Sequence, residues 1–152
     1  MSKKVLFVSL ALILVAGLPF TGFMKEMASA AKKIVVATDA TWAPMEFVDE
    51  TTKEIVGFDI DFMKAVAEAG GFEVEFKNTA WDGIFAGLEA GEYDAVMSSA
   101  TITDERKQTV DFSDPYFNAG QMITVKQGSK IALPADLDGK KVGVQLGTTG
   151  DI

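Results

Sequence analysis

Residues 33–38 read Lys-Ile-Val-Val-Ala-Thr, and residues 58–71 read Phe-Asp-Ile-Asp-Phe-Met-Lys-Ala-Val-Ala-Glu-Ala-Gly-Gly. The first stretch is an unbroken, β-branched apolar run, which is typical of a strand buried on both faces of a parallel sheet. The second stretch predicts a helix over residues 59–69, which Asp59 is expected to cap and Gly70-Gly71 to end. Its apolar residues fall on one helical stripe: Phe58, Phe62, Val66 and Ala69.

The same alternation of strand and helix continues outward from these two stretches. Residues 72–76 alternate between apolar and charged side chains, as a strand does. We further predict a hairpin between 46–48 and 55–56, a helix over 82–90 and a short buried strand over 94–97. This order is the α/β pattern, with right-handed crossovers and helices on both faces of the sheet.

Ligands of α/β sheets bind beyond the carboxyl ends of the strands. Two predicted loops occupy that position, residues 39–44 after the first strand and residues 98–103 after the third. Farther along the chain, we predict strands over 121–126 and 141–144, separated by a helical turn over 134–137. These elements read as the start of a second unit.

The first thirty residues have the organisation of a secretory signal peptide. Lys3 and Lys4 precede an uncharged apolar run over residues 5–20, and Ala28-Ser29-Ala30 forms an A-x-A cleavage pattern. The apolar run is shorter than the roughly 20 residues of a membrane-spanning helix. We therefore expect cleavage after Ala30 and a periplasmic or secreted protein.

The composition of the remaining chain excludes several functional classes. Without residues 1–30, the chain has 11 basic and 21 acidic residues, a net charge near −10, which argues against nucleic-acid or anionic-membrane partners. It contains no Cys and no His, so a disulfide framework, a lipid-anchor cysteine and the usual catalytic base and metal ligands are missing. We predict no catalytic residue, no metal and no cofactor.

Arg106 is the residue whose position is least expected from local structure. It lies in the first turn of the helix predicted after Thr103, where a cation is unfavourable unless it faces an anion. Arg pairs with a carboxylate through two parallel hydrogen bonds, and Ser98, Ser99 and Thr101 precede it at a strand terminus. One interpretation is that these residues form a carboxylate-binding site. The other is that Arg106 is a solvated surface residue and that the Ser and Thr side chains are ordinary helix caps.

Two tryptophans and a glycine turn are weaker candidates. Trp42 and Trp81 each lie near an acid, Asp39 or Asp82, and could hold an ammonium group or an aliphatic stem, or could be ordinary half-buried aromatics. Residues 147–150 could present backbone N–H groups to an anion, although no Lys follows as in a Walker motif. The acid pairs Asp59/Asp61 and Asp111/Asp114 are interpreted as caps of helices and turns.

In this order, these pieces resemble the amino-acid-binding family of bacterial solute-binding proteins that serve ABC importers. The run from Thr101 to Tyr116 is the most specific part of the resemblance. The other matching stretches are 37–39, 42–47, 57–61, 81–84 and 142–149. The resemblance implies a two-lobed periplasmic-binding-protein-like fold, with lobe 1 at residues 31–118 and the start of lobe 2 at residues 119–152.

The resemblance also implies a role for each candidate side chain. Arg106 would clamp the α-carboxylate of an amino acid, helped by Ser99, Thr101 and the backbone near Thr149. Ser98 would accept a hydrogen bond from the α-ammonium group of the same ligand. Trp42 and Trp81 would wall the ligand side chain, Asp39 would bind its polar or cationic end, and Gln145 would line the pocket from the second lobe. Asp59, Asp111 and Asp114 would be structural.

Members of that family continue well beyond the point where this sequence stops, so the resemblance implies a fragment. Because binding closes two lobes around the ligand, the chain alone is expected to bind poorly and to be partly molten or aggregation-prone, with exposed strand edges.

Three functions compete. The first is a monomeric receptor that delivers a polar or basic amino acid to an ABC permease. The second is a periplasmic dehydratase of the same fold, and the third is the sensing module of a larger membrane receptor. Turnover of prephenate or arogenate would identify the second function, and a downstream signalling domain the third.

Overall fold

The computed structural model describes residues 31–151 of the chain. The predicted signal peptide lies outside the described residues. Within residues 31–151, no helix has the length and apolar character needed to cross a membrane.

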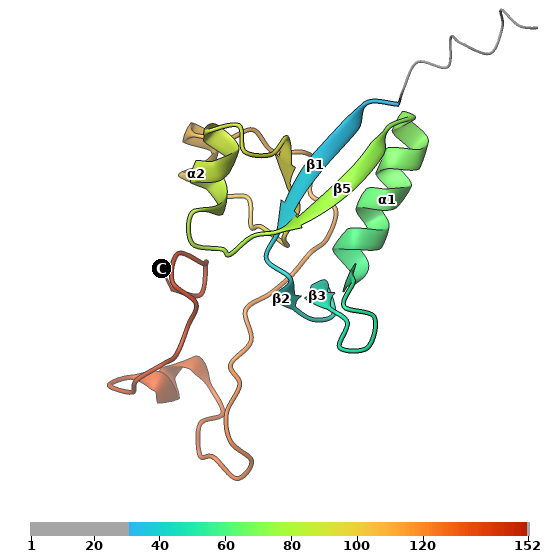
Figure 1. Ribbon diagram of the computed structural model, residues 1–152. Helices are drawn as coiled ribbons and strands as arrows, with labels where there is room; N and C mark the ends of the chain where they lie inside the picture. Colours follow the sequence, from blue (N-terminus) through green and yellow to red (C-terminus); the bar gives the residue numbers. More distant parts are fainter. Residues whose placement is uncertain (1–30, 152) are drawn as a thin grey trace, which may run out of the picture. The chain divides into compact units, whose positions relative to one another are not determined.

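A three-stranded parallel sheet forms the centre of the described chain (Figure 1). Strand β1 (Lys33–Thr38) lies between β5 (Glu73–Asn78) and β6 (Ala95–Val96), and the order is β5-β1-β6. Val36 pairs with Phe76 on one side and with Ala95 on the other. The buried, β-branched run of β1 is therefore the central strand, as its composition predicts.

Two helices cover the sheet from opposite sides, as Figure 1 shows. Helix α1 (Phe58–Gly70) contacts β5, and α2 (Ile84–Glu89) contacts β6. Ala37 joins Ile84 and Tyr93 in a buried cluster beneath α2, while the adjacent Val36 points to the other face, as neighbouring strand residues do. The predicted α/β arrangement is confirmed.

A second, smaller sheet holds the loop that follows β1. Strands β2 (Thr41–Trp42), β3 (Glu46–Val48) and β4 (Ile55–Val56) pair antiparallel in that order. The predicted hairpin of residues 46–48 and 55–56 is confirmed. Within the predicted loop over 39–44, Thr41 and Trp42 form the two-residue strand β2, because Thr41 pairs with Phe47.

Two details of α1 differ from the sequence prediction. The stripe of Phe58, Phe62 and Val66 is about 40% exposed, and Ile60 and Ala67 are the apolar residues that are buried. Apolar side chains occupy most positions of α1, so periodicity alone does not identify the face that meets the sheet. The N-cap is Gly57, and no side chain caps the helix; the prediction that Asp59 caps it is wrong, because its carboxylate is buried and binds elsewhere.

The chain after β6 has little regular structure. It contains two 3₁₀ turns, η1 (Arg106–Gln108) and η2 (Pro134–Leu137), and the second confirms the predicted helical turn. The helix expected after Thr103 is reduced to η1. The strands predicted over 121–126 and 141–144 are absent from the described chain. Their side chains are exposed, Met122 by 87%, and a strand forms only where a neighbouring strand takes up its backbone hydrogen bonds.

Candidate functional site

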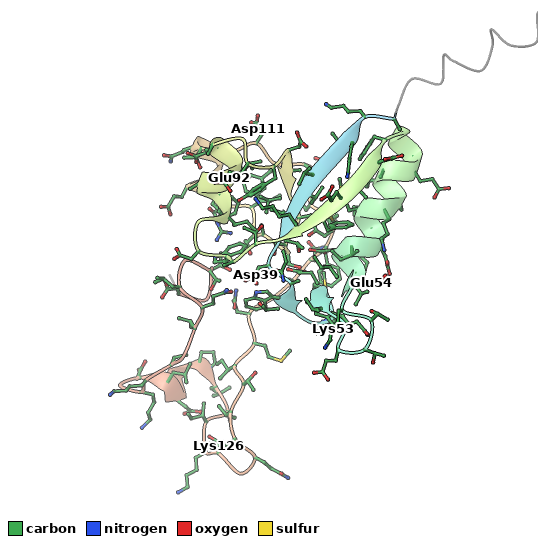
Figure 2. All side chains as sticks on the ribbon, in the orientation of Figure 1. Asp39, Lys53, Glu54, Glu92, Asp111 and Lys126 are labelled. Atoms are coloured by element: carbon green, nitrogen blue, oxygen red, sulfur yellow. The ribbon has the colours of Figure 1, made fainter. Side chains whose placement is uncertain are left out.

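The site begins where β1 ends. Asp39 follows Thr38, the last residue of β1, and is buried; Figure 2 shows it at this end of the strand. Its backbone N–H donates to Ser98 Oγ at 2.9 Å, so the loops after β1 and β6 are joined at the carboxyl ends of two neighbouring strands. This is the position in which ligands of α/β sheets bind, and the sequence predicted both loops there.

Two buried carboxylates fix the turn of Ser98 and Ser99. Ser98 Oγ donates to Glu46 Oε1 at 3.0 Å, and Ser99 Oγ lies 3.2 Å from Glu46 Oε2 and 3.1 Å from Asp59 Oδ2. The Ser99 N–H and the Tyr116 hydroxyl also donate to Asp59 Oδ2, at 2.7 and 2.9 Å. The Ser98 hydroxyl, predicted to accept from a ligand ammonium group, is therefore turned inward.

Glu46 is a functional candidate that sequence reasoning missed. Its side chain is completely buried, and burial, followed by the charge of Asp59, raises its pKa to about 8. Burial and the charge of Asp59 also raise the pKa of Tyr116. Neighbouring side chains in a strand point to opposite faces, so an acid next to the apolar Phe47 is expected to face solvent. No signal in the sequence identifies Glu46 as buried.

Arg106 lies against aromatic side chains rather than in open solvent. Its guanidinium carbon is 5.2 Å from the ring centres of both Trp81 and Phe85, within cation–π range. Nη1 donates to the Thr101 carbonyl at 2.8 Å, and Nη2 donates to the Gly147 carbonyl at 2.9 Å. Burial lowers the pKa of Arg106 from its ordinary value, although the group stays charged at neutral pH.

The turn of residues 145–149 contacts both charged groups of the site. Gln145 Nε2 donates to Asp39 Oδ2 at 2.9 Å, while the Gly147 carbonyl accepts from Arg106. The Thr149 hydroxyl lies 3.3 Å from that of Thr101. Gln145 and Thr149, both named from the sequence as candidate site residues, therefore lie beside Asp39 and Thr101 respectively.

The structure gathers most of the predicted site residues, with one exception. Trp42 lies in β2, opposite Glu46 in the hairpin register, and is 44% exposed. Trp81 instead lines a hollow of about 280 Å³ that is also bordered by Phe85 and by Gly147 of the 145–149 turn. Neither Asp39 nor Arg106 borders that hollow, so the polar contacts define the candidate site better than the hollow does. Within residues 31–151, no three acidic side chains are placed to share a metal ion.

The chain is similar in sequence to a known protein family. The model of the family "Bacterial extracellular solute-binding proteins, family 3" matches residues 34–147. A curated relative from Neisseria gonorrhoeae, named "Probable histidine-binding protein", is 47% identical over 125 residues, which are 82% of this chain and 46% of the relative.

Two solved structures are similar as well. The arginine-, lysine-, histidine-binding protein ArtJ from Geobacillus stearothermophilus is 54% identical, with a TM-score of 0.74 over 78% of this chain and 51% of that chain. A mutant of domain 1 from TmArgBP, in its arginine-bound form, is 44% identical, with a TM-score of 0.55 over 58% of this chain and 67% of that domain. The chain spans about half the length of the full relatives that it matches.

Proposed function

This chain belongs to family 3 of the bacterial extracellular solute-binding proteins, and we propose that it is the ligand-binding part of an exported receptor for a basic amino acid, with arginine as the favoured ligand. Its fold is the α/β fold of the two-lobed periplasmic binding proteins, of which it covers the first lobe and the start of the second. We place the change between lobes near residue 118.

The observation that carries this proposal is the placement of two opposite charges against one short turn. Asp39 and Arg106 bind Gln145 and Gly147 respectively, and these two turn residues are only two positions apart. Two residues of extended backbone span at most about 7 Å. The carboxylate and the guanidinium therefore contact one short turn from two sides, and in this proposal each holds one end of a basic amino acid.

At one end, Arg106 supplies the groups that a ligand α-carboxylate needs. Two of its N–H groups already donate in different directions, to the Thr101 and Gly147 carbonyls. A carboxylate is a stronger acceptor than a neutral carbonyl, so a ligand carboxylate would replace both carbonyls and accept two hydrogen bonds from the guanidinium. In this proposal, the hydroxyls of Thr101 and Ser99 and the backbone near Thr149 complete the carboxylate site.

At the other end, Asp39 supplies the counter-charge for a cationic side chain. Its two oxygens accept from the Thr41 hydroxyl and the Gln145 amide, both neutral donors. Within residues 31–151 it forms no ion pair. A buried carboxylate gains most from a charged partner, so a ligand guanidinium or ammonium group is favoured over the amide. Trp81 and Trp42 would wall the stem, and the main chain of Ser98, whose hydroxyl is turned inward, would face the α-ammonium group.

The similar structures support this choice of ligand and bear on the affinity of the chain. ArtJ is described as binding arginine, lysine and histidine, and domain 1 of TmArgBP was solved in its arginine-bound form. That domain is a single unit and nevertheless holds arginine. By analogy, we propose that lobe 1 of this chain provides the main contacts, and that closure by a second lobe adds affinity.

The remaining parts of the proposal concern the whole protein. We propose that it is exported through residues 1–30, that it acts as a monomer outside the cytoplasm, and that it delivers its ligand to an ABC-type permease without chemical conversion. The matched relatives are binding proteins, which supports a receptor over an enzyme.

A calorimetric titration of the chain with each of the twenty amino acids tests the proposal. We expect saturable heat with arginine, less with lysine and histidine, and none with aspartate or glutamate, because Asp39 repels an acidic side chain. Equal responses to all amino acids, or turnover of prephenate or arogenate, would overturn the assignment.

A further inference from the structure

Two buried carboxylates in this chain share a single hydroxyl group. Ser99 Oγ is within hydrogen-bond distance of both Glu46 Oε2, at 3.2 Å, and Asp59 Oδ2, at 3.1 Å. A serine hydroxyl has one proton to donate. If both carboxyl groups were ionised, one carboxylate oxygen would face a hydroxyl lone pair in a buried site, which is strongly unfavourable. The geometry therefore requires one additional proton in this cluster.

The hydrogen-bond partners indicate which carboxyl group holds that proton. Asp59 Oδ2 accepts from three donors, the N–H and hydroxyl of Ser99 and the hydroxyl of Tyr116, and such convergence stabilises an anion. Glu46 is fully buried on β3, and its carboxyl oxygens lie within hydrogen-bond distance of the hydroxyls of Ser98 and Ser99. Among residues 31–151, no Lys or Arg forms an ion pair with either acid.

We propose that Glu46 is protonated at neutral pH and is a positioning residue for the ligand site, an inference that rests on the proposed function. Glu46 donates from Oε2 to Ser99 Oγ, which donates to Asp59. Glu46 Oε1 accepts from Ser98 Oγ, which in turn accepts the Asp39 N–H. One proton thus completes a chain of hydrogen bonds from α1 to the backbone N–H of Asp39, the residue whose carboxylate is proposed to bind the ligand side chain.

This chain holds backbone that would otherwise relax. Ser99 has φ of +47°, in the left-handed region that non-glycine residues rarely adopt, and such a conformation persists only where its surroundings enforce it. Ser99 and Ser98 also border the proposed carboxylate and ammonium sites. Loss of the Glu46 proton would place two anions around one hydroxyl and release the turn, so the ligand groups would lose their alignment.

The direction of the pH effect follows from the groups that face Glu46. They are Asp59 on α1, whose charge disfavours ionisation of Glu46, and Tyr116, which donates its hydroxyl to Asp59. Burial and the charge of Asp59 raise the pKa of Glu46 to about 8. The protonated, binding-competent form is complete at lower pH and is lost as the pH rises through about 8. In the unfolded chain Glu46 ionises near its ordinary value, so folding stability also declines as the pH rises between the two values.

The test compares arginine binding by the full chain and by its Glu46→Gln variant at pH 7 and pH 9, by calorimetry. The Gln amide reproduces the protonated acid, because its oxygen accepts from Ser98 and its nitrogen donates to Ser99 at every pH. The dissociation constant of the parent relative to the variant should rise about tenfold over this interval, as expected for a group with a pKa near 8. Titration of the arginine amino group affects both proteins equally and cancels in the ratio.

A second measurement needs no substitution. Infrared difference spectra of the parent chain between pH 7 and pH 10 should contain the carbonyl stretch of a protonated carboxyl group that disappears at the higher pH. A constant ratio of dissociation constants in two folded proteins, or no such carbonyl signal, overturns the inference while arginine binding itself stands. A failure of both proteins to bind arginine at any pH, with the carbonyl signal present, instead overturns the proposed function.

Discussion

Replacement of Arg106 by Met should abolish most of the affinity for arginine. The guanidinium offers two N–H groups that now bind the Thr101 and Gly147 carbonyls, and the proposed ligand carboxylate takes the same fork. A hydrogen bond between charged partners contributes about 1.5–3 kcal/mol. Loss of two such bonds costs about 3–6 kcal/mol, so the dissociation constant should rise about 10²- to 10⁴-fold.

Arg106→Lys separates charge from geometry. Lysine keeps the positive charge but offers no planar fork. We therefore expect about half of the loss in binding free energy, which raises the dissociation constant roughly ten- to hundredfold. The matched control is Lys107→Met, which removes the same charge one residue away. Lys107 is exposed and pairs with Asp104 at 3.6 Å, and such surface pairs contribute about 0–1 kcal/mol.

The assay is calorimetric titration with arginine near neutral pH, accompanied by a thermal melt of each variant. The melt is required because Arg106 also packs on Trp81 and Phe85, and its loss will lower stability. Binding by a folded Arg106→Met variant within a factor of three of the parent would refute the reasoning. Equal losses in Arg106→Met and Lys107→Met would show that only the general electrostatic field matters.

Three further predictions concern the side-chain pocket and the fold. Asp39→Asn should weaken arginine binding by about 2 kcal/mol, roughly 30-fold, because the cationic ligand loses its counter-charge. In the same titration, the affinity for glutamine should change by no more than a few-fold. Equal losses for both ligands would contradict this role of Asp39. Trp81→Ala should weaken arginine binding about tenfold by removing the aromatic support of the guanidinium, as calorimetry would measure, and unchanged affinity would contradict it. Gly57→Ala should lower the free energy of unfolding by about 3 kcal/mol or more in a melt, because Gly57 has φ of +129° and a Cβ atom there would lie 2.3 Å from the Met45 carbonyl oxygen. The control, Gly128→Ala, has φ of +82° and open space around it, and should cost only about 1–2 kcal/mol.

The central sheet was predictable because its signals are local. The apolar run of β1 and the alternation in β5 each identify a strand without knowledge of its partners. By contrast, the strands predicted over 121–126 and 141–144 depend on neighbours that the described chain does not place beside them. The face of α1 was also ambiguous, because apolar residues occur on more than one side of that helix.

The site was predictable where a residue conflicted with its local setting. Arg106 is unfavourable near the start of a helical turn, and that conflict identified a side chain that the structure places against Trp81. Glu46 gave no such signal, because an acid in a short hairpin strand is ordinary. Its burial results from contacts with Ser98 and Ser99, more than fifty positions away in the sequence, and no periodicity within the strand reports contacts over such a separation.

Titration of the unmodified chain with arginine and with agmatine, which is arginine without its carboxylate, tests most directly whether Arg106 recognises an α-carboxylate. Both ligands carry the same guanidinium group for Asp39, and only arginine can bind the fork of Arg106. We expect saturable binding of arginine and at least about 10²-fold weaker binding of agmatine. Agmatine binding as tight as that of arginine would contradict the account.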